Sequence, residues 1–264
     1  MKFFNKKNKL FPTIEPFDSG FINQGVHEIY YEQCGNPDGK PAIFLHGGPG
    51  GQSRTGYSSF IQYLVNHGYA ILAVNNRGSS GYGKTFYKMD DLNHGDKDLK
   101  DCIWGKKWLQ DQDYIDAEKI GIYGGSFGGY SAAMAPMLRP DLYKSSVAYI
   151  GVFDLEMLYN EGDIKGIKWG GKYLDKTLGQ DPEKIKEMSP VHQAHKLQAP
   201  MIIVSGKEDQ RAPIEHAYAL ADALEAADKE HELILVPKEG HGFRKPENRL
   251  MLYKKMLEHF DRTL

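Results

Sequence analysis

Short apolar runs alternate with amphipathic stretches along most of the chain. The runs that we interpret as strands are residues 42–46, 69–75, 120–124, 146–150, 201–205 and 232–237. Between them, residues 98–109 and 214–227 repeat apolar side chains at helical spacing, which predicts amphipathic helices. Strands that alternate with helices are typical of a mostly parallel sheet with helices on both faces. The pattern therefore predicts an α/β fold.

Two segments depart from this pattern. Residues 1–41 contain an extended stretch at 27–34, followed by the turn sequence Asn-Pro-Asp-Gly at 36–39, which predicts a hairpin that leads into the edge of the sheet. Residues 152–198 are irregular and rich in aromatic side chains, and we interpret them as a small helical cap. A chain of 264 residues with this organisation is expected to form a single domain.

Residues 124–128 read Gly-Gly-Ser-Phe-Gly and lie between a predicted strand and the small-residue helix 130–138. A strand, a tight turn and a helix in this order form the nucleophile elbow of the α/β-hydrolase fold, where the strained turn requires small residues. The alternative is a glycine-rich turn whose serine only caps the helix. We favour Ser126 as a nucleophile, because suitable catalytic partners follow it in the sequence.

A serine hydroxyl needs a base that accepts its proton, and the base must be held in one tautomer. Asp209 follows the predicted strand 201–205, and His241 follows the last predicted strand between two glycines. The order Ser, Asp, His is the one that the α/β-hydrolase fold uses. Glu208 is the alternative acid, and we prefer Asp209. The histidines expected in helical or polar surface stretches are His67, His94, His216, His231 and His259.

The loop at residues 46–51 reads His-Gly-Gly-Pro-Gly-Gly and follows a predicted strand. Such a loop supplies one donor of an oxyanion hole, and the backbone N–H after the nucleophile supplies the other. We therefore predict an oxyanion hole made by Gly48 and Phe127. His46 is expected to shape the loop through a hydrogen bond.

The aromatic residues of the predicted cap are candidates for substrate binding. We expect Phe153, Tyr159 and Trp169 to line the pocket for the acyl or P1 group. The alternative is that each ring packs against the sheet, as most aromatic side chains do.

A rival motif occurs at residues 78–85, whose sequence Gly-Ser-Ser-Gly-Tyr-Gly-Lys-Thr matches the phosphate-binding loop,. Such a loop opens directly into a helix, whereas residues 86–96 show no sustained helical face. The pattern thus disfavours nucleotide binding.

Metal binding has little support in the sequence. Cys34 and Cys102 are far apart, and the pair His192 and His195 lacks further ligands at useful spacing,. We expect no metal and no cofactor.

Composition narrows the function further. Hydrophobic residues make up 41% and charged residues 26% of the chain, values typical of a folded globular protein. The formal net charge is −2 and the lysines are dispersed, which argues against nucleic acid and favours a small, nearly neutral substrate. Residues 1–11 lack the apolar region of a signal peptide, and no stretch approaches the roughly 20 apolar residues of a membrane span. We expect a cytoplasmic protein with no membrane partner and reduced cysteines.

From about residue 52 to residue 264 the sequence resembles the catalytic domain of the prolyl oligopeptidase family, especially its acylaminoacyl- and dipeptidyl-peptidase-like members. The matching segments are residues 76–83, 124–129, 189–190, 206–213 and 239–243. The resemblance implies a catalytic triad of Ser126, Asp209 and His241 and an oxyanion loop at residues 46–49. The first fifty residues resemble proline iminopeptidases instead, at 10–12, 15–20, 32–37 and 46–51. Recombination, design or natural fusion would explain this combination.

The resemblance also shapes the expected substrate. Family members usually carry an N-terminal β-propeller that restricts access and, in exopeptidases, holds the substrate's amino end. A chain of 264 residues leaves no room for a propeller, so we expect an open site. We expect a serine hydrolase that cleaves small activated esters and short peptides or aminoacyl arylamides. Proline-specific or aminopeptidase action rests on the resemblance alone. The alternative is a catalytically idle or engineered α/β-hydrolase scaffold or binding module.

Overall fold

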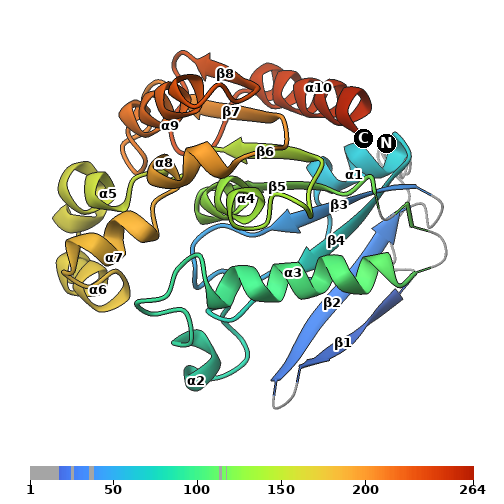
Figure 1. The fold of residues 1–264 in the computed structure, drawn as a ribbon, viewed down its shortest axis with the longest axis horizontal. Coiled ribbons are helices and arrows are strands. Elements are labelled where there is room, and N and C mark those ends of the chain that lie inside the picture. The colour runs from blue at the N-terminus through green and yellow to red at the C-terminus, as the bar shows by residue number, and fades with distance from the viewer. Residues whose placement is uncertain (1–17, 25–26, 36–38, 113–114, 117) are drawn as a thin grey trace, which may run out of the picture.

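A single mixed sheet forms the centre of the protein (Figure 1). The computed structural model describes all residues except 1–17, 25–26, 36–38, 113–114 and 117. The strands follow the order β1-β2-β4-β3-β5-β6-β7-β8, in which β1 and β2 run antiparallel and the remaining six are parallel. The strands are β1 Asp18–Gln24, β2 His27–Gly35, β3 Lys40–Leu45, β4 Tyr69–Val74, β5 Gly121–Gly125, β6 Ser145–Tyr149, β7 Met201–Gly206 and β8 His231–Val236. The predicted α/β class is confirmed.

Helices cover both faces of the sheet. On one face α1 and α10 pack, and on the other α3, α4 and α9. The α-helices are α1 Ser59–Asn66, α2 Lys84–Tyr87, α3 Lys97–Gln110, α4 Phe127–Leu138, α5 Leu155–Glu161, α6 Gly170–Thr177, α7 Pro182–Glu187, α8 Pro190–Gln193, α9 Ile214–Ala226 and α10 Pro246–Thr263; η1 Asp163–Gly166 and η2 Ala194–Lys196 are 3₁₀ turns. Among the described residues, no helix is long and apolar enough to cross a bilayer.

The burial of the strands on both faces explains the continuous apolar runs. Successive strand residues point to opposite faces. On β5, Ile122 packs with α3 and α4, and the next residue, Tyr123, packs with α1 and α10. A strand covered on both sides is therefore apolar at nearly every position, and the six predicted strands lie within two residues of β3 to β8.

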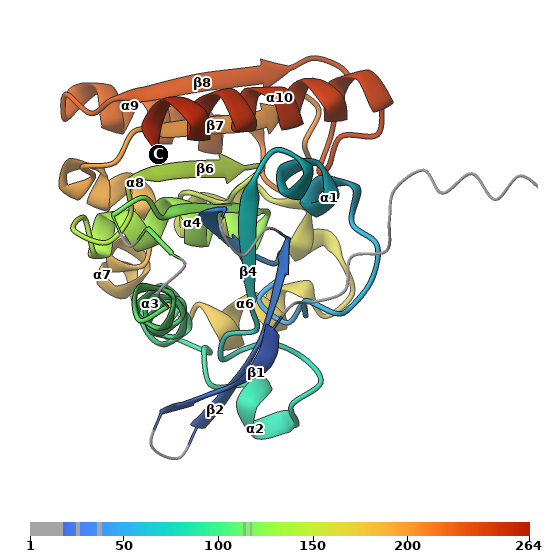
Figure 2. The ribbon, with the colours of Figure 1, turned by 90° about the vertical axis from the view of Figure 1, so that its right-hand side faces the viewer.

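The expected hairpin around residues 36–39 is wrong. Strand β2 pairs with β1 on one side and with β4 on the other, whereas β3, the next strand in sequence, lies between β4 and β5. A turn sequence indicates where the chain reverses but does not determine which strand becomes the neighbour. The hairpin that exists is β1–β2, and it projects from the edge of the sheet (Figure 2).

A buried ion pair fixes the loop that follows β4. Arg77 donates to both carboxylate oxygens of Asp101 from Nε at 3.0 Å, and its backbone N–H donates to Oδ2 at 2.7 Å. Its guanidinium also donates to the carbonyl of Lys97 at 2.9 Å. The side chain of Asp101 on α3 is 3% exposed. The loop is thus tied to the helix beneath it.

Replacing Asp101 with alanine should lower the free energy of unfolding by about 3 kcal/mol, because it leaves the Arg77 guanidinium without its counter-charge. Urea denaturation monitored by circular dichroism measures this change. The matched control is Asp141→Ala, which removes an exposed pair with Arg139 and should cost less than about 1 kcal/mol. Equal losses in the two variants would contradict the role assigned to the buried pair.

Candidate active site

Ser126 occupies a strained turn between β5 and α4. Its backbone has φ 59° and ψ −122°, a conformation that non-glycine residues seldom adopt and that is typical of functional sites. Its N–H donates to the carbonyl of Tyr149 at 3.0 Å. A Cβ at Gly128 would lie 2.1 Å from the carbonyl oxygen of Leu45, so only glycine permits the first turn of α4 to lie this close to β3. Packing therefore requires the glycine at position 128 of this motif.

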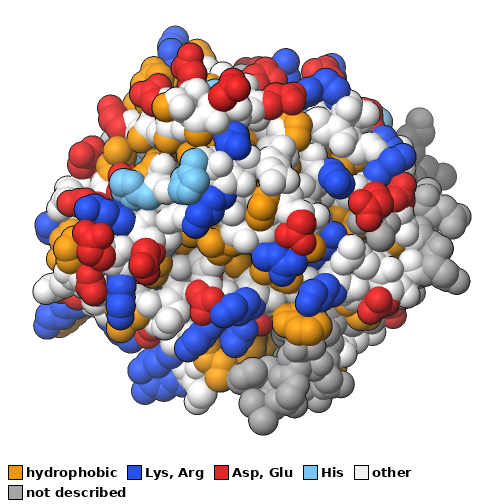
Figure 3. Space-filling model, viewed as in Figure 1, with side chains coloured by type: hydrophobic (Ala, Val, Ile, Leu, Met, Phe, Trp, Pro, Cys, Tyr) orange, Lys and Arg blue, Asp and Glu red, His pale blue; other side chains and the backbone are white. Residues whose placement is uncertain are grey.

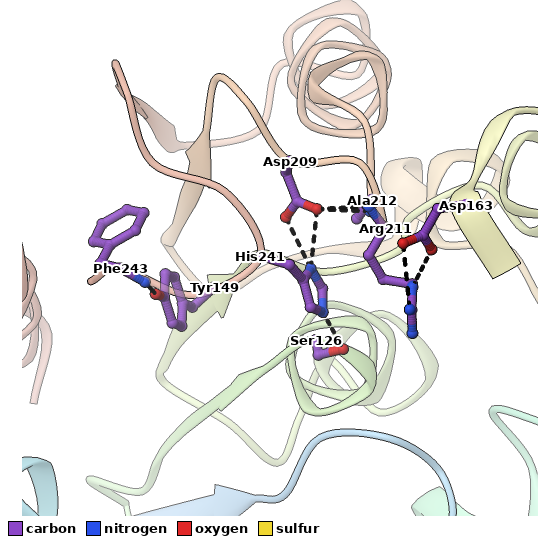
Figure 4. Close-up of polar contacts among 8 residues, drawn as sticks. All are labelled: Ser126, Tyr149, Asp163, Asp209, Arg211, Ala212, His241 and Phe243. Atoms are coloured by element: carbon purple, nitrogen blue, oxygen red, sulfur yellow. Dashed lines mark hydrogen bonds and ion pairs between the residues drawn. The ribbon is translucent and has the colours of Figure 1, made fainter. Parts of the chain in front are cut away.

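The structure brings together the three residues predicted as a triad (Figure 4). Ser126 Oγ lies 2.7 Å from His241 Nε2, and His241 Nδ1 lies 2.8 Å and 3.1 Å from the two carboxylate oxygens of Asp209. With Nδ1 donating to Asp209, Nε2 is left as the acceptor for the serine proton. The three residues come from the loops after β5, β7 and β8.

Asp209 is held in place by backbone donors. Its Oδ1 accepts hydrogen bonds from the N–H groups of Arg211 at 2.9 Å and Ala212 at 3.0 Å, and its side chain is fully buried. These donors and the imidazole satisfy the carboxylate in a site without water contact. The competing acid, Glu208, is exposed.

Hydrogen bonds from residues before and after His241 fix the loop that carries it. Glu239 accepts hydrogen bonds from the N–H groups of Arg244 and Lys245 at 2.8 Å and 3.1 Å and from the Asn248 side chain at 2.7 Å. The bond from Arg244 and the other two donors hold the pKa of Glu239 below its usual value. The phenol oxygen of Tyr149 accepts from the N–H of Phe243 at 2.7 Å. Glu239 and Phe243 belong to the segment 239–243 that carries the family resemblance, but the sequence gives no sign of their contacts with Tyr149 and Asn248, which belong to no motif.

The loop predicted to supply an oxyanion donor lies against the elbow. A Cβ at Gly47 would lie 2.8 Å from the carbonyl oxygen of Gly125 and 3.1 Å from Ser126 Cβ. As expected, His46 shapes the loop: its Nε2 lies 2.8 Å from Ser79 Oγ. Both Gly48 and Phe127 line the cavity beside Ser126. The N–H of Phe127 opens α4, where helical N–H groups have no intrahelical partner.

A cavity of about 380 Å³ opens beside the serine. Its walls come from the elbow, the oxyanion loop, the segment after β6, and α6. The lining residues are Gly48, Pro49, His94, Ser126, Phe127, Val152, Leu155, Leu158, Ile164, Ile167, Lys168, Trp169, Gly170, Tyr173, Leu174, Thr177, Leu178 and Arg211. The segment predicted as a cap thus forms much of the wall. Arg211 forms an ion pair with Asp163 of η1 that links the loop after β7 to this segment (Figure 4).

Of the three aromatic residues expected in the pocket, the structure places only Trp169 there. Phe153 is 1% exposed and packs in the core between α4 and α9. Tyr159 donates to Asp175 at 2.8 Å and lines a separate cavity. On α5, Tyr159 lies one turn after Leu155, on the side of the helix that lines the active-site cavity,. Its ring nevertheless reaches Asp175 and the separate cavity. The expectation is therefore corrected for Phe153 and Tyr159.

Three histidines expected at the surface are buried. His94, His216 and His259 are at most 3% exposed, and burial lowers the pKa of each to about 4. His216 accepts hydrogen bonds at Nδ1 from two backbone N–H groups at the start of the cap. A histidine in a polar or amphipathic stretch carries no local signal of burial, so only the packing of distant elements could reveal this.

The phosphate-loop pattern has a different use in the structure. Its lysine begins α2, which has only four residues, so no extended helix follows to bind a phosphate. Instead Ser79 contacts His46, and the N–H of Ser80 donates to the carbonyl of Gly51 at 2.9 Å. These residues support the oxyanion loop.

Within the described part of the chain, no cluster of three or more histidine, cysteine or acidic residues could hold a metal ion. Cys102 is a buried free thiol.

The fold and the site define an α/β hydrolase with a serine, histidine and aspartate in hydrogen-bonding contact. The comparisons with known proteins identify its family. The model of the prolyl oligopeptidase family matches residues 55–264, so the chain belongs to the prolyl oligopeptidase family, as its motifs predicted. The resemblance of the first fifty residues to proline iminopeptidases stays a prediction, and most of residues 10–20 lie outside the described part.

The relatives are named peptidases. The chain is 32% identical over 227 residues to dipeptidyl aminopeptidase BIII of Pseudoxanthomonas mexicana, covering 81% of this chain and 32% of that protein. It is 27% identical to the acylamino-acid-releasing enzyme of Rattus norvegicus, covering 81% and 31%. The acylaminoacyl peptidase of Pyrococcus horikoshii superposes with a TM-score of 0.89 at 28% identity, over 97% of this chain and 43% of that one. The chain therefore spans about a third of the length of the curated relatives it matches.

Asp209→Asn should reduce kcat by about ten-thousandfold, because an amide cannot hold the histidine in the tautomer that accepts the serine proton. Steady-state hydrolysis of an activated ester, combined with the rate of labelling by a fluorophosphonate, measures the change. Glu208→Gln is the matched control and should retain the parent rate. If Glu208→Gln showed the larger loss, the acid would be Glu208.

Phe153→Ala should lower the free energy of unfolding by about 3–5 kcal/mol, because it empties a core position. Trp169→Ala should change the free energy of unfolding by less than about 0.5 kcal/mol, because the residue is 65% exposed,. It should instead raise KM, because the ring lies at the cavity wall. Thermal or urea denaturation and initial-rate kinetics on both variants separate the two roles. A raised KM with unchanged stability in Phe153→Ala would reverse our correction.

Proposed function

We propose that this chain is a serine peptidase domain that cleaves short peptides and small esters through an acyl-enzyme on Ser126. The hydrogen-bonded chain from Ser126 through His241 to Asp209 carries the proposal. In the first step His241 Nε2 accepts the proton of Ser126 as Oγ attacks the substrate carbonyl, and it then donates that proton to the leaving amine. In the second step His241 activates a water molecule that hydrolyses the acyl-enzyme. Asp209 stabilises the imidazolium in both steps.

The N–H groups of Gly48 and Phe127 stabilise the negative charge that develops on the carbonyl oxygen. Their positions beside Ser126 at the cavity wall support this role. Backbone donors in a packed loop need no reorganisation during the reaction, and the loss of one such donor typically costs on the order of 3 kcal/mol in the barrier. Two contacts hold this loop in position against the elbow. They are the hydrogen bond between His46 and Ser79 and the close approach of Gly47 to the elbow.

The cavity receives the side chain on the acyl side of the scissile bond. Its size lies at the lower end of the roughly 300–1,000 Å³ found for small-molecule sites, so it suits one side chain of moderate size. Leu155, Leu158 and Leu174 give it apolar walls. A related acylaminoacyl peptidase has been solved with Z-Gly-Gly-Phe-chloromethyl ketone, which supports a peptide substrate with an apolar residue at this position.

The face of the molecule shown in Figure 3 gives no reason to invoke a polyanionic partner. On this face, basic and acidic side chains are interspersed and form no single-sign field. We propose a short peptide or small ester as the substrate and a cytoplasmic location, without nucleic acid or membrane as a partner. The names of the relatives support two kinds of peptide, those with an acylated amino end and those with a free one.

Hydrolysis of a matched panel tests the proposal. The panel contains p-nitrophenyl butyrate, alanyl-p-nitroanilide, prolyl-p-nitroanilide and acetyl-alanyl-p-nitroanilide, each with the parent and with Ser126→Ala. We expect ester and arylamide turnover in the parent and a loss of at least about a thousandfold in Ser126→Ala. Preference for the acetylated or the free amino end decides between acylaminoacyl peptidase and aminopeptidase action. Equal rates in parent and variant on every substrate would refute the proposal and favour an idle scaffold.

A further inference from the structure

A histidine whose Nδ1 has no hydrogen-bond partner among the described residues lies in the wall of the active-site cavity. His94 lines this cavity, yet its residue is only 3% exposed. Its ring packs edge-on against Phe127, with ring centroids 5.0 Å apart, and Phe127 itself stacks on Tyr130. The imidazole is therefore held rigidly beside the residue that follows the nucleophile. The apolar residues that line the same cavity include Val152, Leu155, Leu174 and Leu178.

Asp90 lies beside the imidazole, and Asp98 interacts electrostatically with Asp90. His94 Nδ1 is 3.6 Å from Asp90 Oδ2, beyond the length of a hydrogen bond, and both atoms are buried without a partner among the described residues. Asp98 Oδ1 accepts from the N–H of Leu99, but its Oδ2 is also buried and unpaired. Burial raises the pKa of Asp90 to about 7 and that of Asp98 to about 8. A buried polar atom without a partner is uncommon in native interiors, so these atoms call for an explanation.

We propose that His94 is a specificity residue: its Nε2, the ring nitrogen remote from Asp90, hydrogen-bonds a hydroxyl at the tip of the side chain that the cavity receives. The substrate class is peptides and acyl groups with a tyrosyl or similar hydroxylated ring at this position. The inference rests on the proposed function, since it assumes that the cavity binds the side chain next to the scissile bond.

The two possible protonation states of the His94–Asp90 pair favour a hydroxyl of the substrate over other polar groups. An ionised Asp90, 3.6 Å away, favours the tautomer with the proton on Nδ1, in which Nε2 is an acceptor,. A protonated Asp90 removes this preference, so the tautomer with Nε2–H as a donor also becomes available. Because the pKa of Asp90 is raised to about 7, both arrangements occur near neutral pH. A hydroxyl donates and accepts, so it matches either arrangement, whereas an ammonium group or a carboxylate matches only one.

The apolar walls explain why the hydroxyl should be carried on a ring. Leucine and valine side chains that surround the cavity favour an aromatic body by burial, and the imidazole then selects by its polar tip. A site built to hydrogen-bond a hydroxyl discriminates against the analogue that lacks it, because the protein group is left unpaired. One such bond corresponds to a preference of about tenfold.

The test compares Z-Gly-Gly-Tyr-p-nitroanilide with Z-Gly-Gly-Phe-p-nitroanilide. We expect the parent to favour the tyrosyl substrate in kcat/KM by about tenfold and His94→Phe to abolish that preference. His94→Gln, which keeps a donor and an acceptor, should restore part of it. His192→Phe, the same substitution at an exposed position on α8, should behave as the parent. The ratio of the two substrates is the readout, because a partial loss of folded enzyme lowers both rates equally.

A parent without a tyrosyl preference, or a preference that survives in His94→Phe, would overturn the inference. The proposed function fails separately, if neither substrate shows turnover that depends on Ser126. In that event the inference is decided by binding: titration calorimetry of Ser126→Ala with the peptides Z-Gly-Gly-Tyr and Z-Gly-Gly-Phe should still show tighter binding of the tyrosyl peptide, and the added substitution His94→Phe should remove the difference. Equal affinities in Ser126→Ala would overturn it.

Discussion

The close contact between the start of α4 and the end of β3 is the constraint on which the site depends. With glycine at position 128, the helix comes so close that a Cβ would lie 2.1 Å from the Leu45 carbonyl oxygen. This contact forces Ser126 into its positive φ and places its hydroxyl at the N-terminus of a helix. It also fixes the oxyanion loop, which follows β3 directly. The proposed nucleophile and oxyanion donors therefore share one rigid anchor, as electrostatic preorganisation requires.

The remaining catalytic groups reach this anchor on loops, and each loop is immobilised by its own polar contacts. Backbone N–H groups hold Asp209, and the Glu239 carboxylate holds the segment after His241 by joining it to the start of α10. The Arg77–Asp101 pair fixes the loop after β4. Ser79 of that loop forms a hydrogen bond with His46 and so holds the oxyanion loop in place. Loops supply the chemistry, and buried charges keep them in one conformation.

The segment between β6 and β7 forms much of the wall of the active-site cavity. Its helices close the cavity from one side, and the ion pair of Arg211 with Asp163 connects them to the loop that carries Asp209. From the other side the loop that precedes α3 contributes His94, and the N–H of Leu92 in this loop donates to the carbonyl of Thr177 on α6. Two segments distant in sequence thus contribute to one pocket. Its walls are mostly apolar, and His94, Lys168, Tyr173, Thr177 and Arg211 add polar groups.

The sequence by itself determined the α/β class, the six central strands, the elbow and the three triad residues, because each depends on a local pattern. Strand runs follow from burial on both faces, and the elbow follows from glycines that only close packing explains. It could not determine that β2 neighbours β4, that Phe153 and Tyr159 point away from the cavity, or that His94 lies in its wall. These features depend on how elements distant in the sequence pack together, and the local sequence around a residue does not specify its tertiary contacts. Only the tertiary structure decided them.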